Sequence, residues 1–139
     1  YTDGGSRGNP GPSGIGVVIC NDKGDVIKEY GEFLGSRFTN NEAEYLAVVS
    51  AMKKIKSLFG KGKIKSLEIE FFADSELMVK QMNGEYKVLN ENIQPLFLLV
   101  WNAKLDFGKV SFKHIPREQN KQADKLANQA LDKENGGLF

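Results

Sequence analysis

Residues 1–16 read Tyr-Thr-Asp-Gly-Gly-Ser-Arg-Gly-Asn-Pro-Gly-Pro-Ser-Gly-Ile-Gly, and the rest of the chain is organised around this stretch. An acidic residue, Asp3, is followed by two glycines and then by Asn-Pro-Gly-Pro at residues 9–12, a pattern that predicts a strand ending in a tight turn. Residues 15–21 predict the next strand. A carboxylate at the end of a strand, beside an open glycine turn, is well placed to hold a hard metal ion.

Two better-known glycine-rich sites fit this stretch less well. A phosphate-binding Walker loop needs Gly-Lys-Ser/Thr, which does not follow these glycines. A dinucleotide fingerprint that starts at Gly14 needs a glycine at position 19, where the chain has Ile19. From the turn alone, a hairpin with an incidental aspartate stays open, because Gly, Asn and Pro clusters are common in loops.

Length and composition indicate a single globular domain covering residues 1–139. The chain is 40% hydrophobic and 27% charged with a net charge of +1, and it is long enough to bury a core without disulfides. With Cys20 as its single cysteine and no apolar run longer than residues 96–101, we expect a cytoplasmic monomer without a membrane anchor. Only two residues precede Asp3, so we expect the natural chain to begin a few residues before Tyr1.

Six lysines gather in one short stretch without an acid: Lys53, Lys54, Lys56, Lys61, Lys63 and Lys65. We favour a solvated helix end whose lysines complement the helix dipole. A patch that follows the phosphates of a nucleic acid stays open as the alternative.

The pattern of apolar residues and turns predicts three strands, followed by helices and further strands. The expected strands are residues 1–3, 15–21, 26–34, 67–72 and 109–115, with a connection at 35–38. The expected helices are residues 40–59, 76–82 and 95–105, and one that begins near residue 121, before a frayed tail at 135–139. This order predicts an α/β fold: an antiparallel meander, right-handed crossovers and a five-stranded mixed sheet flanked by helices.

Two predictions concern the core of the domain. The first predicted helix carries an apolar stripe that we expect to face the sheet, formed by Leu46, Val49, Met52, Ile55 and Phe59. In the helix at residues 95–105 we expect Trp101 to be buried in the core.

Four acids fall at the ends of predicted elements: Asp3, Glu44, Asp74 and Asp124. Asp3 and Asp74 end strands that become parallel neighbours if the helix after Thr39 joins them, so their carboxyl ends meet at one edge of the sheet. Glu44 in that helix and Asp124 near the start of the last helix can reach the same edge. Clustered carboxylates repel one another unless a divalent cation compensates them, and an oxygen-only set favours Mg²⁺ or Mn²⁺. Two such ions, about 3.5–4 Å apart, are suited to in-line attack on a phosphodiester.

The chain resembles type 1 ribonuclease H over essentially its whole length. The resemblance is carried by residues 2–12, Thr39-Asn40-Asn41-Glu42-Ala43-Glu44, Asp74-Ser75 and Asn120-Lys121-Gln122-Ala123-Asp124. It implies the ribonuclease H-like fold, two Mg²⁺ ions held by the four acids, and cleavage of the RNA strand of an RNA–DNA hybrid. The products would carry 3′-hydroxyl and 5′-phosphate ends.

The resemblance also implies a role for each acid. Asp3 would bridge both ions, Glu44 and Asp74 would hold the ion on the leaving-group side, and Asp124 would hold the ion that activates the attacking water. Glu42 lies two residues from Glu44 and points to another side of the helix, so the Thr-Asn-Asn-x-x-Glu spacing selects Glu44.

Further positions match substrate contacts in the family. Asn9, Asn40 and Asn41 match residues that touch the minor groove and RNA 2′-hydroxyls, and Thr39 matches one that contacts a DNA phosphate. Asn40 and Asn41 serving only as helix caps is the alternative.

His114 lies ten residues before Asp124, the offset of a mobile histidine in bacterial relatives that is thought to assist proton transfer or product release. The Ile-Pro-Arg-Glu that follows it is closer to plant and archaeal relatives, so a strand-end histidine with a structural hydrogen bond is the alternative. We therefore predict a Mg²⁺-dependent endoribonuclease acting on RNA–DNA hybrids. The rival predictions are a related nuclease acting on DNA and a catalytically silent hybrid-binding module.

Overall fold

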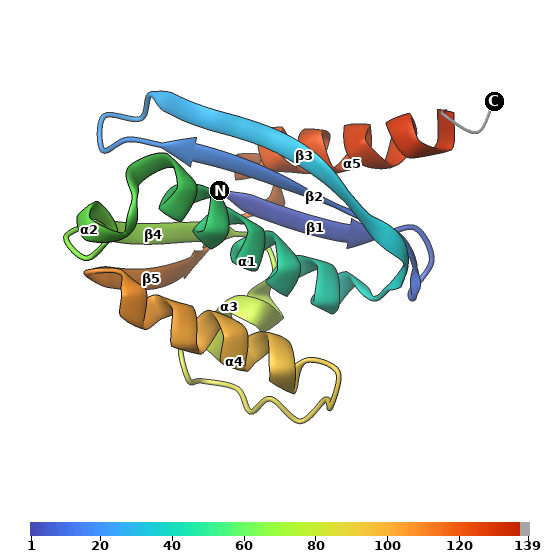
Figure 1. Cartoon of the computed structure of the whole chain (residues 1–139). Coiled ribbons are helices and arrows are strands. Elements are labelled where there is room, and N and C mark those ends of the chain that lie inside the picture. Colours follow the sequence, from blue (N-terminus) through green and yellow to red (C-terminus); the bar gives the residue numbers. More distant parts are fainter. Residues whose placement is uncertain (137–139) are drawn as a thin grey trace.

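A five-stranded sheet with helices on both faces forms the protein in a computed structural model that describes residues 1–136 (Figure 1). The strands are β1 (Thr2–Ser6), β2 (Gly11–Cys20), β3 (Val26–Phe38), β4 (Glu68–Ala73) and β5 (Lys109–His114). The helices are α1 (Asn40–Phe59), α2 (Lys61–Ile64), α3 (Glu76–Met82), α4 (Gln94–Ala103) and α5 (Lys121–Gly136), with single 3₁₀ turns η1 (Lys104–Asp106) and η2 (Arg117–Gln119). The predicted tail is helical as far as Gly136, and its last part, 137–139, lies outside the described residues.

The sheet has the order β3-β2-β1-β4-β5 and the predicted mixture of strand directions. β1 pairs antiparallel with β2, and β2 antiparallel with β3, whereas β4 runs parallel to both β1 and β5. The α/β fold class predicted from the sequence is therefore confirmed. Thr2 of β1 pairs with Ala73 of β4. Asp3 comes directly after Thr2 and Asp74 directly after Ala73, so the two acids lie side by side.

The prediction that the first strand ends at Asp3 is wrong. β1 continues through both glycines to Ser6, because Gly4 and Gly5 pair with Ile15 and Gly14 of β2. A strand neighbour satisfies the backbone of residues that, read locally, are typical of a turn. The same holds for residues 35–38, which extend β3 instead of forming a connection. The turn itself is confined to residues 7–10.

Glycines on one face of the sheet let α5 pack directly against it. A Cβ atom at Gly16 would overlap the main-chain oxygen of Ala123, and one at Gly31 would overlap that of Leu126. Ile15 and Val17, which alternate with these glycines along β2, are buried on the opposite face against α1. The sheet thus presents backbone to α5 and large side chains to α1, and Figure 1 shows these two helices on opposite sides.

The buried face of α1 differs from the predicted stripe. Met52 and Ile55 are buried as expected, but Leu46, Val49 and Phe59 are only partly buried. The centre of the contact is formed by Tyr45, Val48 and the small residues Ala43, Ala47 and Ala51. Counting large apolar residues misplaced the face, because alanine lets a helix approach a sheet closely without contributing to the apolar pattern.

The prediction that Trp101 is buried is also wrong. Its side chain is 44% exposed, stacks on Phe97 with ring centroids 5.7 Å apart, and lies 4.1 Å from the ammonium of Lys104. Val100 takes the buried position of α4 instead. Residues 94–103 include no charged side chain, so periodicity gave little indication of which side of α4 faces water.

The lysine-rich stretch forms the end of α1 and the short helix α2, which was not predicted. Lys53, Lys61, Lys63 and Lys65 are exposed, and Lys56 in the last turn of α1 pairs with Asp106. This arrangement fits a solvated helix end.

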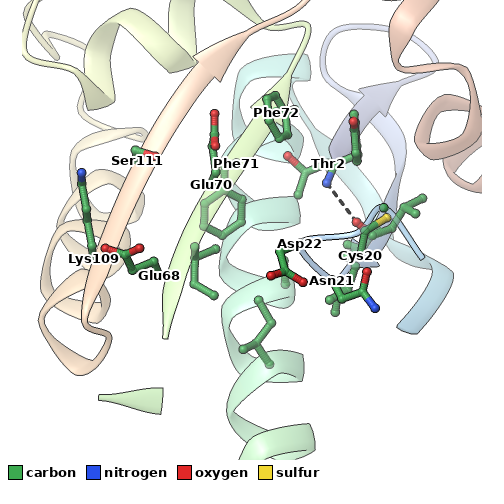
Figure 2. A pocket seen from close by; sticks show the side chains of 18 residues that line it. Thr2, Cys20, Asn21, Asp22, Glu68, Glu70, Phe71, Phe72, Lys109 and Ser111 are labelled. Atoms are coloured by element: carbon green, nitrogen blue, oxygen red, sulfur yellow. Dashed lines mark hydrogen bonds between the residues drawn. The ribbon is translucent and has the colours of Figure 1, made fainter. Parts of the chain in front are cut away.

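A cavity of about 630 Å³ opens beside the start of β1 (Figure 2). Along β4, Ala73 alone pairs with β1, so the edge of β4 over residues 68–72 faces β2 across a gap. Ala51 and Ile55 of α1 also line this cavity. Within residues 1–136, none of the four predicted metal-binding acids lines it. In the same part of the chain, no helix is both long and apolar enough to cross a membrane.

Candidate metal centre

Three of the four acids meet where β1 and β4 lie side by side. Asp3 is in β1, Asp74 directly follows β4, and Glu44 lies in the second turn of α1. One carboxylate oxygen from each lies within 4.8 Å of the others. These acids come from segments separated by about 30 to 40 residues, and the parallel pairing of β1 with β4 together with the packing of α1 brings them together.

The start of α1 is held against β1 at Glu44. The Gly4 N–H donates to Glu44 Oε1 at 2.5 Å. A Cβ atom at Gly4 would overlap the backbone of Ala43, so a glycine is needed for this close approach. Because side chains alternate along a strand, Gly4 faces α1 while its neighbour Asp3 faces the side of α5.

Asp124 lies beside this group, close enough to Asp3 to help raise the pKa of its carboxyl. It is in the first turn of α5, and its side chain is 34% exposed. The guanidinium of the exposed Arg117 lies 3.9 Å from Asp124 Oδ1. The fourth predicted acid thus borders the cluster of three without belonging to it.

Asn120 connects α5 to β1, a role that the sequence analysis did not assign. Its buried Nδ2 donates to the main-chain oxygen of Thr2 at 2.9 Å, and its own main-chain oxygen accepts from the Asp124 N–H at 3.1 Å. Asn120 therefore fixes the start of α5 next to the strand that carries Asp3. An asparagine just before a predicted helix is the local signal that indicates such an anchor.

Asp3 and Glu44 are the most strongly perturbed acids of the centre. They are only 8% and 7% exposed. Burial raises the pKa of Asp3, and the neighbouring carboxylates of Glu44, Asp74 and Asp124 raise it further. Burial also raises the pKa of Glu44, followed by the charge of Asp74, and the hydrogen bond from Gly4 offsets part of this rise. Without a compensating cation, the cluster therefore resists full ionisation.

The donor set fits a hard divalent cation. All of the ligand atoms are carboxylate oxygens, and the site offers neither thiolate nor imidazole among the three clustered residues. Oxygen-only sets of this kind suit Mg²⁺, Mn²⁺ or Ca²⁺ better than Zn²⁺. A divalent cation would also remove the repulsion among the buried acids.

The Glu42 side chain caps the start of α1 and is not part of the cluster of acids. Its N–H donates to Thr39 Oγ1 at 3.1 Å, and its Oε1 accepts from the Thr39 N–H at 2.9 Å. This reciprocal pair is a capping box, which turns Glu42 back toward the N-cap.

The asparagines predicted to contact substrate form a small network between the β1–β2 turn and α1. Asn9 Oδ1 accepts from the Asn40 N–H at 2.9 Å, and Asn40 Oδ1 accepts from the Ser6 N–H at 2.8 Å. Both side chains are exposed, and within residues 1–136 their amide Nδ2 groups donate to no protein atom. In the same part of the chain, the buried Oδ1 of Asn41 has no partner. Thr39, and neither Asn40 nor Asn41, is the side-chain cap of α1, so the alternative that these two asparagines serve only as helix caps is wrong. The contacts of Asn9 and Asn40 use their side-chain oxygens and leave their amide N–H groups available for a ligand.

His114 is the last residue of β5 and is exposed. It pairs with Ala73, the residue before Asp74, and therefore lies at the same edge of the sheet as the acids. The pKa of nearby Glu76 is lowered mainly by Lys80 and to a smaller extent by His114. Among the described residues, the His114 side chain has no hydrogen-bond partner.

The sheet order, together with one acid within β1 and another directly after the parallel strand β4, defines the class of ribonuclease H-like domains. Residues 1–130 match the family described as reverse transcriptase-like. The solved structures similar to this chain include LC11-RNase H1 in complex with an RNA/DNA hybrid, with a TM-score of 0.90, 44% identity and 96% of each chain covered. They also include RNase H1 of Halobacterium salinarum, with a TM-score of 0.86 and 37% identity, again with 96% of each chain covered.

Curated relatives agree with the structural comparison. Ribonuclease HI of Halobacterium salinarum is 37% identical over 95% of this chain and 63% of its own length. A bifunctional protein of Mycobacterium tuberculosis is 36% identical over 94% of this chain and 34% of its own length, so the chain spans only part of these relatives. Ribonuclease H of Pseudomonas entomophila is 30% identical over 95% of this chain and 91% of its own. The chain belongs to the ribonuclease H family, as its sequence motifs predicted.

Proposed function

We propose that this chain is a metal-dependent endoribonuclease that hydrolyses the RNA strand of RNA–DNA hybrids, with residues 1–139 acting as one domain. The observation that carries the proposal is the convergence of Asp3, Glu44 and Asp74 within 4.8 Å, with Asp124 beside them. The choice of substrate is supported by the similarity to LC11-RNase H1, whose structure holds an RNA/DNA hybrid.

In this proposal Asp3, Glu44, Asp74 and Asp124 hold two Mg²⁺ ions, for which Mn²⁺ can substitute. Such ions, when bound, supply Lewis-acid stabilisation and an activated water for in-line displacement at phosphorus. Asp3 would help to hold both ions, because the other three acids all raise its pKa. Glu44 and Asp74 would hold the ion that stabilises the leaving group, and Asp124 would hold the ion that activates the water. The Gly4 N–H orients Glu44 for this task.

The proposed substrate contacts come from the network at the start of α1. The free amide N–H groups of Asn9 and Asn40, with Asn41 next to them, are suited to bind the minor groove and RNA 2′-hydroxyls. Thr39 at the N-cap is suited to receive a phosphate of the DNA strand, because a helix N-terminus favours anions. The exposed ring of His114 is suited to carry a proton or to assist product release at the sheet edge.

The test is cleavage of an end-labelled RNA–DNA hybrid by the unaltered chain and by Glu44→Gln. The unaltered chain should cut only the RNA strand in Mg²⁺ and should lose this activity in EDTA. Glu44→Gln should lose more than the roughly 10–100-fold that loss of an outer-shell partner costs, because it removes a direct ligand. Glu42→Gln is the matched control and should remain active, since glutamine also completes a capping box.

Duplex DNA and double-stranded RNA distinguish the rival functions in the same assay. Cleavage of duplex DNA would favour a related DNA nuclease. Hybrid binding without cleavage in either Mg²⁺ or Mn²⁺ would favour a silent binding module. Wild-type turnover by Glu44→Gln would contradict the assigned centre.

A further inference from the structure

A row of polar side chains runs along the side of α5 that carries Asp124. Asp124, Asn128 and Asp132 recur every four residues and therefore share one side of the helix. Asn128 Nδ2 donates to the main-chain oxygen of Asp124 at 3.0 Å and to its carboxylate Oδ1 at 3.3 Å. The carboxylate of Asp124 thus has an N–H donor one turn further along its own helix.

Arg7 joins this row from the turn between β1 and β2. Its Nη2 donates to Asn128 Oδ1 at 3.4 Å and to Asp132 Oδ1 at 2.7 Å. These contacts determine which way the Asn128 amide faces. A flipped amide would turn its N–H groups toward a guanidinium and its oxygen toward a carboxylate, and both contacts would be repulsive. The cation on one side and the acid on the other therefore select the orientation that donates to Asp124.

We propose that Asn128 is a positioning residue that holds the Asp124 carboxylate in the direction needed for metal binding, and that Arg7 keeps the Asn128 amide turned toward it. The inference rests on the proposed function only in treating Asp124 as a metal ligand. Side chains that hydrogen-bond to metal-binding groups orient them, and their loss typically costs about 10–100-fold in metal affinity. Arg117 is a weaker candidate for this task, because its guanidinium is largely exposed and lies 3.9 Å from Asp124 Oδ1.

The proposal links two parts of the molecule that are far apart in sequence. Arg7 belongs to the same short turn as Asn9, which is bound to the start of α1. Through Arg7 and Asn128, this turn also contacts α5. The glycine-rich turn therefore connects the helix that carries Glu44 with the helix that carries Asp124.

The experiment is a calorimetric Mn²⁺ titration of the whole chain without nucleic acid, combined with thermal unfolding of the metal-free proteins. Asn128→Ala should weaken Mn²⁺ binding about tenfold. Arg7→Ala should weaken it less, and it should have no further effect when added to Asn128→Ala, since both changes act through one amide. Gln129→Ala, the exposed neighbour on the same helix, is the matched control and should bind Mn²⁺ as the unaltered chain does.

A double-mutant cycle separates positioning from general damage to the fold. In an Asp124→Asn background, Asn128→Ala should no longer change Mn²⁺ affinity, because the group that it orients is gone. An equal loss in both backgrounds, or wild-type affinity of Asn128→Ala, would overturn the proposal. The proposed function is tested separately: a chain that binds Mn²⁺ but cuts no hybrid refutes that function and leaves the role of Asn128 intact.

Discussion

Asp3 and Glu44 place two carboxyl groups in a nearly closed environment beside a third, Asp74. Each of these two acids prefers its proton when no cation is present, because burial and like charges disfavour the ionised form. In the unfolded chain the same groups ionise near their usual pKa of about 4. Between the usual pKa of about 4 and the raised pKa values of Asp3 and Glu44, the metal-free folded state therefore binds more protons than the unfolded state.

This difference predicts how the stability of the metal-free protein depends on pH. The pKa values of Asp3 and Glu44 in the folded state are raised above neutrality. Proton binding to these two acids therefore stabilises the folded state fully below about pH 4, and this stabilisation is lost as the pH rises toward the raised pKa values. The free energy of unfolding in EDTA should fall by more than about 1 kcal/mol from this source alone, since one pKa unit corresponds to roughly 1.4 kcal/mol. Denaturant unfolding between pH 5 and pH 8 measures this fall in the free energy of unfolding. Over about this range the folded and unfolded states bind different numbers of protons.

Asp3→Asn provides the control for that measurement. The variant removes one buried acid and should be more stable than the unaltered chain at pH 8 in EDTA, with a weaker pH dependence. Added Mg²⁺ should stabilise the unaltered chain and have little effect on the variant. A variant that is less stable than the unaltered chain at pH 8 would contradict the assigned repulsion.

The packing of α5 on the sheet illustrates how one element depends on residues in others. Gly16 and Gly31 lie on neighbouring strands, and each leaves room for a main-chain oxygen of α5. This contact sets the height of α5 above the sheet, and with it the distance of Asp124 from Asp3. Gly16 of β2 and Gly31 of β3 therefore help to place Asp124, as does the anchor formed by Asn120.

Gly16→Ala should destabilise the protein and move Asp124. The added methyl group would overlap the backbone of Ala123, which cannot rotate away as a side chain can, so α5 must shift. Overpacking of this kind costs about 1–3 kcal/mol. Urea unfolding measures the cost, and a Mn²⁺ titration should show weaker binding.

Gly62→Ala is the matched control for this substitution. Gly62 lies in the short helix α2, and a Cβ atom there would have no neighbour within 4 Å. Alanine in a helix is favoured over glycine by roughly 0.5–1 kcal/mol, so this variant should be at least as stable as the unaltered chain. Equal stability of Gly16→Ala and Gly62→Ala would show that α5 does not depend on the glycine face.

At the scale of the whole domain, the described part of the chain, residues 1–136, shows a gap in the sheet beside the start of β1. The edges of β2 and β4 face one another there across the cavity (Figure 2), and the ammonium group of Tyr1 donates to the Val18 oxygen at 2.9 Å. Burial lowers the pKa of this ammonium group. A backbone in line with β1 would pair with both edges and would replace a partly buried charge by an amide.

We therefore predict that four added residues of alternating valine and threonine before Tyr1 stabilise the domain. Neighbouring strands in a sheet lie about 4.8 Å apart. The new segment would extend β1 and place a further length of strand between β2 and β4. The thermal midpoint should rise by about 4 °C or more, the change expected for roughly 1 kcal/mol. Hydrogen exchange at the amides of residues 68–72 should slow as well.

A Gly-Ser extension of the same length is the control for this prediction. It offers the same backbone groups but low strand propensity and little apolar surface. It should leave the thermal midpoint nearly unchanged. The same midpoint for both extensions would show that the gap does not accept a strand.

Local patterns account for what the sequence alone made predictable. Helix 76–82 with its Ser75 cap was predicted to the residue, because periodicity and capping depend on a few neighbouring side chains. The order of the strands and of the helices other than the short α2, and the choice of Glu44 over Glu42, follow from similar short-range spacing. The motifs that indicate the ribonuclease H family are also short and contiguous.

Tertiary contacts decided the rest. β1 continues past Asp3 because Gly4 and Gly5 pair with β2, and Trp101 is exposed because Val100 takes the buried side of α4. Asn128 faces Asp124 because Arg7, more than 100 residues away in sequence, holds its amide. A pattern of residues indicates which side chains are able to interact, but the direction and distance of each contact depend on how strands and helices pack. The convergence of Asp3, Glu44 and Asp74 was therefore predictable from the sequence, whereas the contacts that orient these side chains required the folded structure.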